Sequence, residues 1–132
     1  MKVQAYLAFN GNCQEALSFY GDLFNAQIKN RQTYEDKTID VPESYRKNIQ
    51  HAELNGKGIS LMAYDASPDT PINNGNQIHM SINMEDKDKA NEVFKKLSEG
   101  GQIHHDFRER EWGHFGRCSD RYGINWMINS EK

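Results

Sequence analysis

The chain has 132 residues, of which 36% are hydrophobic and 27% are charged, and this composition is typical of a soluble globular protein with its own core. The net charge of -3 and the scattered basic residues argue against a nucleic acid or an anionic membrane as partner, and no apolar run approaches the ~18 residues of a membrane span. Residues 1–12 lack the apolar core of a signal peptide, and two cysteines, Cys13 and Cys118, are too few for a disulfide scaffold, so we expect a cytoplasmic protein.

The first half of the chain predicts one helix among several strands. Residues 2–9 form a short apolar run that is typical of a strand. Asn12 and Glu15 form a capping-box pattern, and the apolar residues after them recur at helical spacing, which predicts a helix at about 13–24. The other predictions are strands at 26–34, 49–55 and 58–65 and a loop at 35–48, which is either a lid or an ordinary surface loop.

The second half repeats this order of elements. Residues 66–76 contain two prolines and several turn residues, and they predict a linker. Residues 77–83 alternate and predict a strand, and Gly100-Gly101 ends a stretch of helical spacing. The apolar positions of that predicted helix are Ala90, Val93, Phe94 and Leu97, and the remaining strands are predicted at 102–109, 111–119 and 124–129.

The repeated order indicates a duplication. Gln102-Ile103 follows the second predicted helix, 75 positions after Gln27-Ile28 follows the first. The last strands of the two halves read GISLM and GINWM, 65 positions apart. We therefore predict an α+β fold in which two βαβββ modules, at 1–65 and 77–132, form one domain with a curved, half-open antiparallel or mixed sheet and helices on its convex side.

Alternation along the strands predicts which side chains lie under the helices. These are Ala52, Leu54, Ile59, Leu61, Ala63, Ile78, Met80, Ile82, Ile124, Trp126 and Ile128. The opposite face collects His51, Glu53, Ser60, Met62, Tyr64, Gln77, His79, Ser81, Asn125, Met127 and Asn129. A sheet with one solvated face gives such a pattern without any function. However, this face holds thioethers, amides and imidazoles rather than many charges, and in a curled sheet it would suit a small-molecule pocket.

Three stretches resemble the PhnB-like branch of the vicinal oxygen chelate superfamily, which includes glyoxalase I, bleomycin-resistance proteins and extradiol dioxygenases. They are AYLAFNGNCQEALSFYGDLF at 5–24, HAELNGKGISLMAYD at 51–65 and EWGHFGRCSDRYGINWMIN at 111–129. The resemblance spans about residues 2–130 and implies the duplicated fold. Members are often named 3-demethylubiquinone-9 3-methyltransferase-like, but no nucleotide-binding loop or glycine-rich helix start here supports methyl transfer.

The resemblance also implies where the superfamily's metalloenzymes hold their metal, on the first and last strands of each half. In this sequence the last-strand positions are Met62 and Met127, and the first-strand positions fall near Ala5 and Gln77, or at His79 after a shift of two residues. A thioether is a poor ligand for Mg, Mn, Ni or Zn, and alanine offers no ligand. We therefore expect no glyoxalase-type metal and no other cofactor.

Three functions remain open at this point. The first is a small-molecule-binding protein that needs no metal, as in the resistance members, and that forms a homodimer because its edge strands need partners. The second is a lyase or isomerase of the glyoxalase type, with His51 and Glu53 as acid and base, or with zinc bound by these two residues and His79. The third is a structural or regulatory dimer. The expected ligand-binding residues are Met62, Tyr64, Gln77, His79, Trp112, Asn125 and Met127.

Three further positions have alternative interpretations. Cys13 lies in the first turn of a predicted helix, where the helix dipole lowers a thiol pKa, so it is either reactive or a plain helix-start residue. Trp112 opens a predicted strand and either closes over the pocket or packs in the core. His104 and His105 are adjacent on a strand and are expected to face opposite ways.

Overall fold

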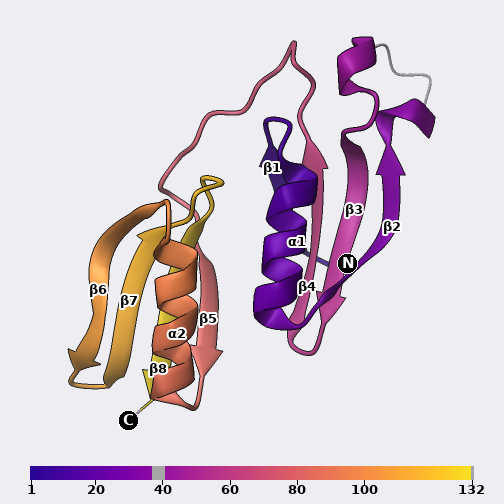
Figure 1. Ribbon diagram of the computed structural model, residues 1–132. Coiled ribbons are helices and arrows are strands. Elements are labelled where there is room, and N and C mark those ends of the chain that lie inside the picture. Colours follow the sequence, from indigo (N-terminus) through magenta and orange to yellow (C-terminus); the bar gives the residue numbers. More distant parts are fainter. Residues whose placement is uncertain (37–40, 132) are drawn as a thin grey trace. The chain divides into compact units, whose positions relative to one another are not determined.

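The structure is a computed structural model that describes residues 1–36 and 41–131 (Figure 1). It divides into unit 1, Met1–Asn73, and unit 2, Asn74–Lys132, and the boundary lies in the predicted linker. Unit 1 contains β1 (Tyr6–Phe9), α1 (Cys13–Phe24), β2 (Gln27–Thr33), β3 (Ile49–Gly56) and β4 (Ile59–Asp65). Unit 2 contains β5 (Met80–Met84), α2 (Lys87–Ser98), β6 (Gln102–Arg110), β7 (Gly113–Ser119) and β8 (Asn125–Glu131). The prediction of an α+β fold with two βαβββ modules is therefore confirmed.

Each unit has a mixed four-stranded sheet, with the order β1-β4-β3-β2 in unit 1 and β5-β8-β7-β6 in unit 2. The first strand of each unit pairs parallel to the last, and the other pairs are antiparallel. Tyr6 lies opposite Met62, and Ser81 lies opposite Met127. This shared register supports the duplication. The strand partners of the two methionines are Tyr6, which is adjacent to the predicted Ala5, and Ser81, which lies four residues beyond Gln77 and two beyond the alternative His79.

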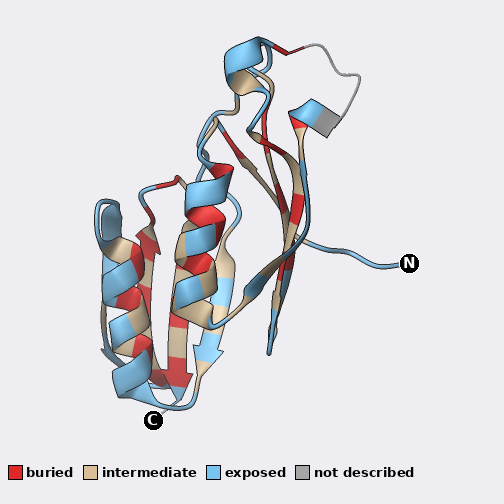
Figure 2. Ribbon diagram, turned by 45° about the vertical axis from the view of Figure 1, so that its right-hand side comes forward, coloured by how far each residue is buried: buried red, intermediate tan, exposed pale blue. Residues whose placement is uncertain are grey.

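One helix covers one face of each sheet. Within each unit, Figure 2 shows buried residues on the helix and on the strands that it covers. In unit 1 the buried side chains include Leu17 and Tyr20 of α1 with Leu54 and Leu61 of the sheet. Each such side chain contributes about 1.5–3 kcal/mol when it is fully buried. In unit 2 the corresponding residues include Phe94, Leu97, Trp126 and Ile128. The predicted helix-covered face is therefore largely right.

Ile78 is the exception on that face, since it is 79% exposed and precedes β5. The predicted strand at 77–83 begins only at Met80, because the side chain of Asn125, and not a neighbouring strand, binds the backbone before Met80. The Asn125 side-chain amide donates to the carbonyl oxygens of Gly75 at 2.8 Å and Ile78 at 3.0 Å. Gln77 is consequently exposed and lies outside the strand.

The two helices begin in different ways. The backbone N–H groups of Gly11 and Cys13, at the start of α1, donate to Asp65 Oδ1 at 3.0 and 2.9 Å. The other carboxylate oxygen, Oδ2, accepts from Ile49 N at 2.9 Å. Asn12 makes no side-chain cap bond, so the predicted capping box is wrong: a residue at the end of β4 supplies the cap. α2 is capped locally by Asp86, which accepts from the N–H groups of the first turn.

Unit 2 has a comparable buried carboxylate in Asp120. Its Oδ1 accepts the N–H groups of Tyr122 and Ile124 at 2.9 and 3.0 Å, and its Oδ2 accepts from Trp126 Nε1 at 2.8 Å. The indole therefore fills the core and also fixes the turn that leads into β8.

Replacing Trp126 with phenylalanine should lower the free energy of unfolding by about 1–3 kcal/mol. The substitution leaves an aromatic ring in the core but removes the donor to a buried carboxylate oxygen. Urea denaturation measures the change. Trp112→Phe is the matched control, because Trp112 is 65% exposed, and it should stay within about 0.5 kcal/mol of the parent protein. Equal losses in both variants would contradict this assignment.

Within the described part of the chain, neither helix has the length and apolar character needed to cross a membrane.

Candidate functional site

The open face of each sheet, defined as the face opposite its helix, carries the candidate site residues. In unit 1 a row of paired residues crosses this face, with Tyr6 on β1, Met62 on β4 and Glu53 on β3. The Tyr6 ring makes edge contacts with two neighbours, Tyr64 at a centroid distance of 5.3 Å and His51 at 5.6 Å. The predicted residues His51, Glu53, Met62 and Tyr64 are therefore neighbours, and sequence reasoning missed Tyr6.

Polar groups on this face form a hydrogen-bonded chain. The Tyr6 hydroxyl and His51 Nδ1 are 2.6 Å apart, and His51 Nε2 lies 3.5 Å from Glu53 Oε2. The Asn30 amide donates to the same carboxylate oxygen at 2.9 Å. Asn30, which sequence reasoning also missed, has a φ of 53° in an irregular part of the β2–β3 pairing, and no local pattern signals this.

The electrostatics of Glu53 follow from these contacts. The hydrogen bond from Asn30 holds the pKa of Glu53 below its usual range, and the contact with His51 acts in the same direction. The carboxylate is therefore ionised at neutral pH. A carboxylate with a lowered pKa is a weak base, so this group suits binding better than proton abstraction.

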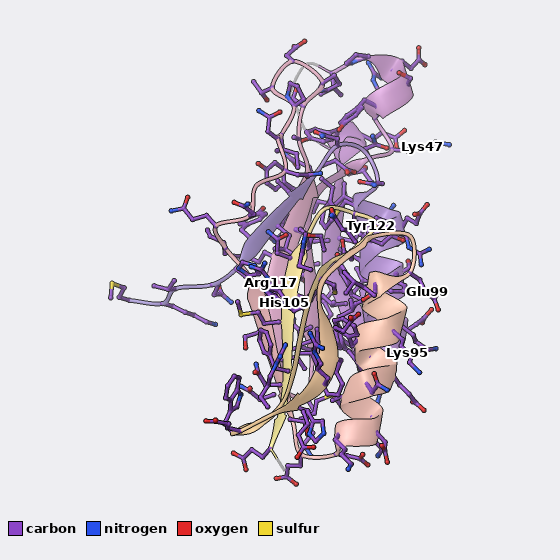
Figure 3. The ribbon with its side chains drawn as sticks, turned by 90° about the vertical axis from the view of Figure 1, so that its left-hand side faces the viewer. Lys47, Lys95, Glu99, His105, Arg117 and Tyr122 are labelled. Atoms are coloured by element: carbon purple, nitrogen blue, oxygen red, sulfur yellow. The ribbon has the colours of Figure 1, made fainter. Side chains whose placement is uncertain are left out.

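The open face of unit 2 has an equivalent row with different chemistry. Ser81, Met127, Arg117 and His105 face one another across β5, β8, β7 and β6. Figure 3 shows Arg117 and His105 on the side of the sheet away from α2, on which Lys95 lies. Arg117 therefore holds the position beside a methionine that Glu53 holds in unit 1. Sequence reasoning missed Arg117, because the repeat offset of 65 positions leads from Glu53 to Cys118, and the pairing with Met127 depends on the register between β7 and β8.

Asn125 takes part in a structural hydrogen-bond chain on the same face. His104 Nε2 and Ser119 Oγ are 2.8 Å apart, and Ser119 Oγ donates to Asn125 Oδ1 at 2.8 Å. The prediction that His104 and His105 face opposite ways is wrong. A bulge between Ile103 and His105 shifts the register, so that both imidazoles contact residues of the open face.

Trp112 lies in the turn between β6 and β7, not at the start of a strand. It is exposed, so the core-packing interpretation is wrong. It lines a cavity of about 600 Å³ together with Asn83, Met84, Glu85, Asn129, Ser130 and Glu131. Of the other expected ligand-binding residues, His79 belongs to unit 2 and, like Gln77, precedes β5.

Other candidates from the sequence have structural roles. Cys13 is fully buried, and burial together with the nearby Asp65 raises its thiol pKa, so the reactive interpretation is wrong. In the predicted loop at 35–48, Tyr45 donates its hydroxyl to the Ala66 carbonyl and packs near Tyr34. Residues 37–40 of that loop lie outside the described residues.

The donor chemistry of the two rows does not fit a glyoxalase-type metal. Across residues 1–36 and 41–131, no group of three or more His, Cys, Asp or Glu is placed to hold a metal ion. The row of unit 1 offers a single carboxylate beside a thioether. In the row of unit 2, a guanidinium lies beside Met127 and would repel a cation.

Comparisons with known proteins agree with this architecture. The model of a family described as 3-demethylubiquinone-9 3-methyltransferase matches residues 1–129. Protein PA1353 from Pseudomonas aeruginosa is 32% identical, with a TM-score of 0.88 over 99% of this chain and 98% of that one. The PhnB protein from Bacillus cereus is 23% identical, with a TM-score of 0.82 over 98% and 99%. A glyoxylase/bleomycin resistance protein/dioxygenase domain from Frankia sp. EAN1pec shares the fold, at 12% identity and a TM-score of 0.69 over 100% and 98%.

Proposed function

Because the chain belongs to the 3-demethylubiquinone-9 3-methyltransferase family, within the PhnB-like branch of the vicinal oxygen chelate superfamily, we propose that it binds a small organic molecule on its open faces without a metal. The observation that carries this proposal is the ordered polar chain of Tyr6, His51 and Glu53 beside Met62 and Tyr64. Small-molecule sites combine apolar walls with a few fixed polar groups. Methyl transfer, named in the family's description, is not part of this proposal, because the sequence has no glycine-rich loop before either helix.

The metal-free part of the proposal rests on ligand chemistry. Both positions that carry last-strand ligands in the superfamily's metalloenzymes hold thioethers, Met62 and Met127. Metal analysis of the purified protein should find far less than one equivalent of any divalent ion. A stoichiometric metal that disappears in Glu53→Ala or His79→Ala would refute this part and favour the zinc alternative.

The second candidate function is a lyase or isomerase of the glyoxalase type. The 3.5 Å contact between His51 and Glu53 supports it, because such a pair can move a proton on a bound substrate. The lowered pKa of Glu53 favours the binding function over this one. The substitution Glu53→Gln, which keeps the shape of the side chain, separates these two candidate functions. If the protein is an enzyme, the variant should lose turnover; if it is a binding protein, the variant should bind its ligand more weakly.

Methionine-methyl NMR gives the direct test of ligand binding. The chain has five methionines, and Met62 and Met127 lie on the open faces, whereas Met80 and Met84 lie on the helix-covered face of β5. In a screen of small molecules against protein labelled with ¹³C at the methionine methyl groups, we expect bound compounds to shift the signals of Met62 or Met127. The signal of Met80, which lies opposite the buried Trp126, serves as the internal control.

The contrary outcomes of that screen are equally clear. If no compound shifts Met62 or Met127, and native mass spectrometry finds no retained molecule, the third function, a structural or regulatory dimer, is favoured. If all the methyl signals shift together, the compound perturbs the fold as a whole and does not bind at the proposed faces.

We further propose that the protein is a homodimer of the cytoplasm. β1 and β2 are the outer strands of one sheet, and β5 and β6 of the other, and outer strands need cover. Both cysteines are free and buried, which suits a reducing compartment. Light scattering after gel filtration should give about twice the 15.3 kDa mass of one chain.

A further inference from the structure

Arg117 has a buried donor without a partner on the open face of unit 2. Its Nε is buried and makes no hydrogen bond to any residue that the structure describes. An unpaired buried donor is unfavourable, and more so on a charged group, so in native proteins such a donor usually binds a ligand or an ordered water. Arg117 lies in the row of Met127, away from the helix (Figure 3).

The surroundings of Arg117 favour a negatively charged partner. Its strand neighbours are His105 on β6 and Met127 on β8, and the adjacent row contains Phe115 and Arg108. Neither row contains a carboxylate: their members are Ser81, Met127, Arg117, His105, Asn83, Asn129, Phe115 and Arg108. The equivalent row of unit 1 differs, because its charged residue, Glu53, already binds Asn30 and His51.

We propose that Arg117 binds an anionic group, a carboxylate or phosphate, of the small molecule that the open face takes. The planar guanidinium offers parallel donors that match the two oxygens of such a group. Met127 and Phe115 flank the position and provide surface for an apolar part of the ligand. This inference rests on the proposed function and narrows it to small organic anions.

The ¹⁵N NMR signal of the Arg117 side chain tests this inference, since it reports on the Nε–H group itself. The probes are benzoate and phenyl phosphate, with benzyl alcohol as the neutral counterpart. We expect both anions to shift the Nε–H signal in a saturable way and benzyl alcohol to leave it unchanged. Arg117→Gln should weaken phenyl phosphate binding by about 10- to 100-fold, the effect of losing charge-assisted hydrogen bonds.

Arg110→Gln is the matched control. It removes the same charge at the end of β6, opposite Gly113. The affinity for phenyl phosphate should change less than about twofold if direct contacts with Arg117 matter more than long-range electrostatic attraction. Arg117→Lys keeps the charge but loses the parallel donors of the guanidinium, so its affinity for phenyl phosphate should lie between those of the parent and Arg117→Gln. The parent-like ¹⁵N spectrum of each variant establishes that it is folded.

Two results would overturn the inference. One is an Arg117 Nε–H signal that neither anion moves, and the other is an equal loss of affinity in Arg117→Gln and Arg110→Gln. If neutral compounds still shift the Met62 or Met127 methyl signals in either case, the proposed function stands and only the anion site fails. If no compound shifts those methyl signals, the proposed function itself fails.

Discussion

Replacing Asp65 with alanine is expected to lower the free energy of unfolding by about 3–5 kcal/mol. The carboxylate is 1% exposed and accepts three backbone N–H groups, from Gly11, Cys13 and Ile49. Each of these donors loses its partner in the variant, and two of the bonds are buried. Burial raises the pKa of Asp65, and the three donors oppose that rise, so the group is held by hydrogen bonds rather than by a nearby cation. Urea denaturation measures the loss.

Two further variants make this prediction specific. Asn12→Ala changes the residue that the sequence marks as the helix cap, yet its side chain makes no cap bond, so stability should change by less than about 0.5 kcal/mol. Asp65→Asn keeps one acceptor oxygen but turns an amide N–H₂ toward one of the donors. Its free energy of unfolding should therefore lie between those of the parent and Asp65→Ala. A larger loss for Asn12→Ala than for Asp65→Ala would show that the local cap dominates after all.

Gly101→Ala is expected to destabilise unit 2 by about 3 kcal/mol or more. A Cβ atom at this position would lie 2.0 Å from the Ser119 carbonyl oxygen and 2.8 Å from the carbonyl carbon of Asp120. Both atoms belong to the backbone, so no side chain can rotate away, and the start of β6 would have to separate from β7. Thermal or urea unfolding of the variant measures the effect.

Gly75→Ala is the control for this substitution. A Cβ atom there meets nothing within 4 Å, and the residue does not adopt a left-handed φ. Its stability should therefore stay within about 0.5 kcal/mol of the parent, or rise slightly because alanine restricts the unfolded chain. Similar losses for the two glycines would mean that the close approach at Gly101 does not limit stability.

Much of the fold could be predicted from the sequence because its signals are local. The helix predicted at 13–24 has the bounds of α1, since its apolar residues recur at helical spacing up to Asn25, which adopts a left-handed conformation. The strands at 49–55 and 58–65 correspond to β3 and β4 within a residue, because a glycine turn separates two alternating runs. Periodicity and turn residues were sufficient for these elements.

The failures come from contacts that no local pattern records. Asn125 binds the backbone at Gly75 and Ile78, which delays the start of β5, and Asp65 takes over the cap expected of Asn12. The bulge beside His104 likewise depends on pairing with β7 and is invisible in an alternation of side chains. Each case joins positions that lie far apart in the chain.

The candidate site divides in the same way. His51, Glu53 and Met62 could be placed together because they share one face of a hairpin with a clear turn. Tyr6 was missed because the sequence left open the register of the first strand. Arg117 was missed because its neighbour depends on the register between β7 and β8. The repeat offset of 65 positions leads from Glu53 to Cys118, so only the register between β7 and β8 identifies Arg117 as the neighbour of Met127.

The remote cap of α1 also bears on the order in which the protein folds. The Cys13 N–H finds its acceptor 52 positions later, on the last strand of unit 1, whereas Asp86 caps α2 from within its own turn. A helix nucleus is costly, and a contact across so long a loop must first close that loop. We therefore expect the first turn of α1 to gain its capping hydrogen bonds only after β4 has joined the sheet, whereas α2 has its capping residue next to it in the chain. Despite their shared order of elements, the two modules are thus expected to begin folding by different routes.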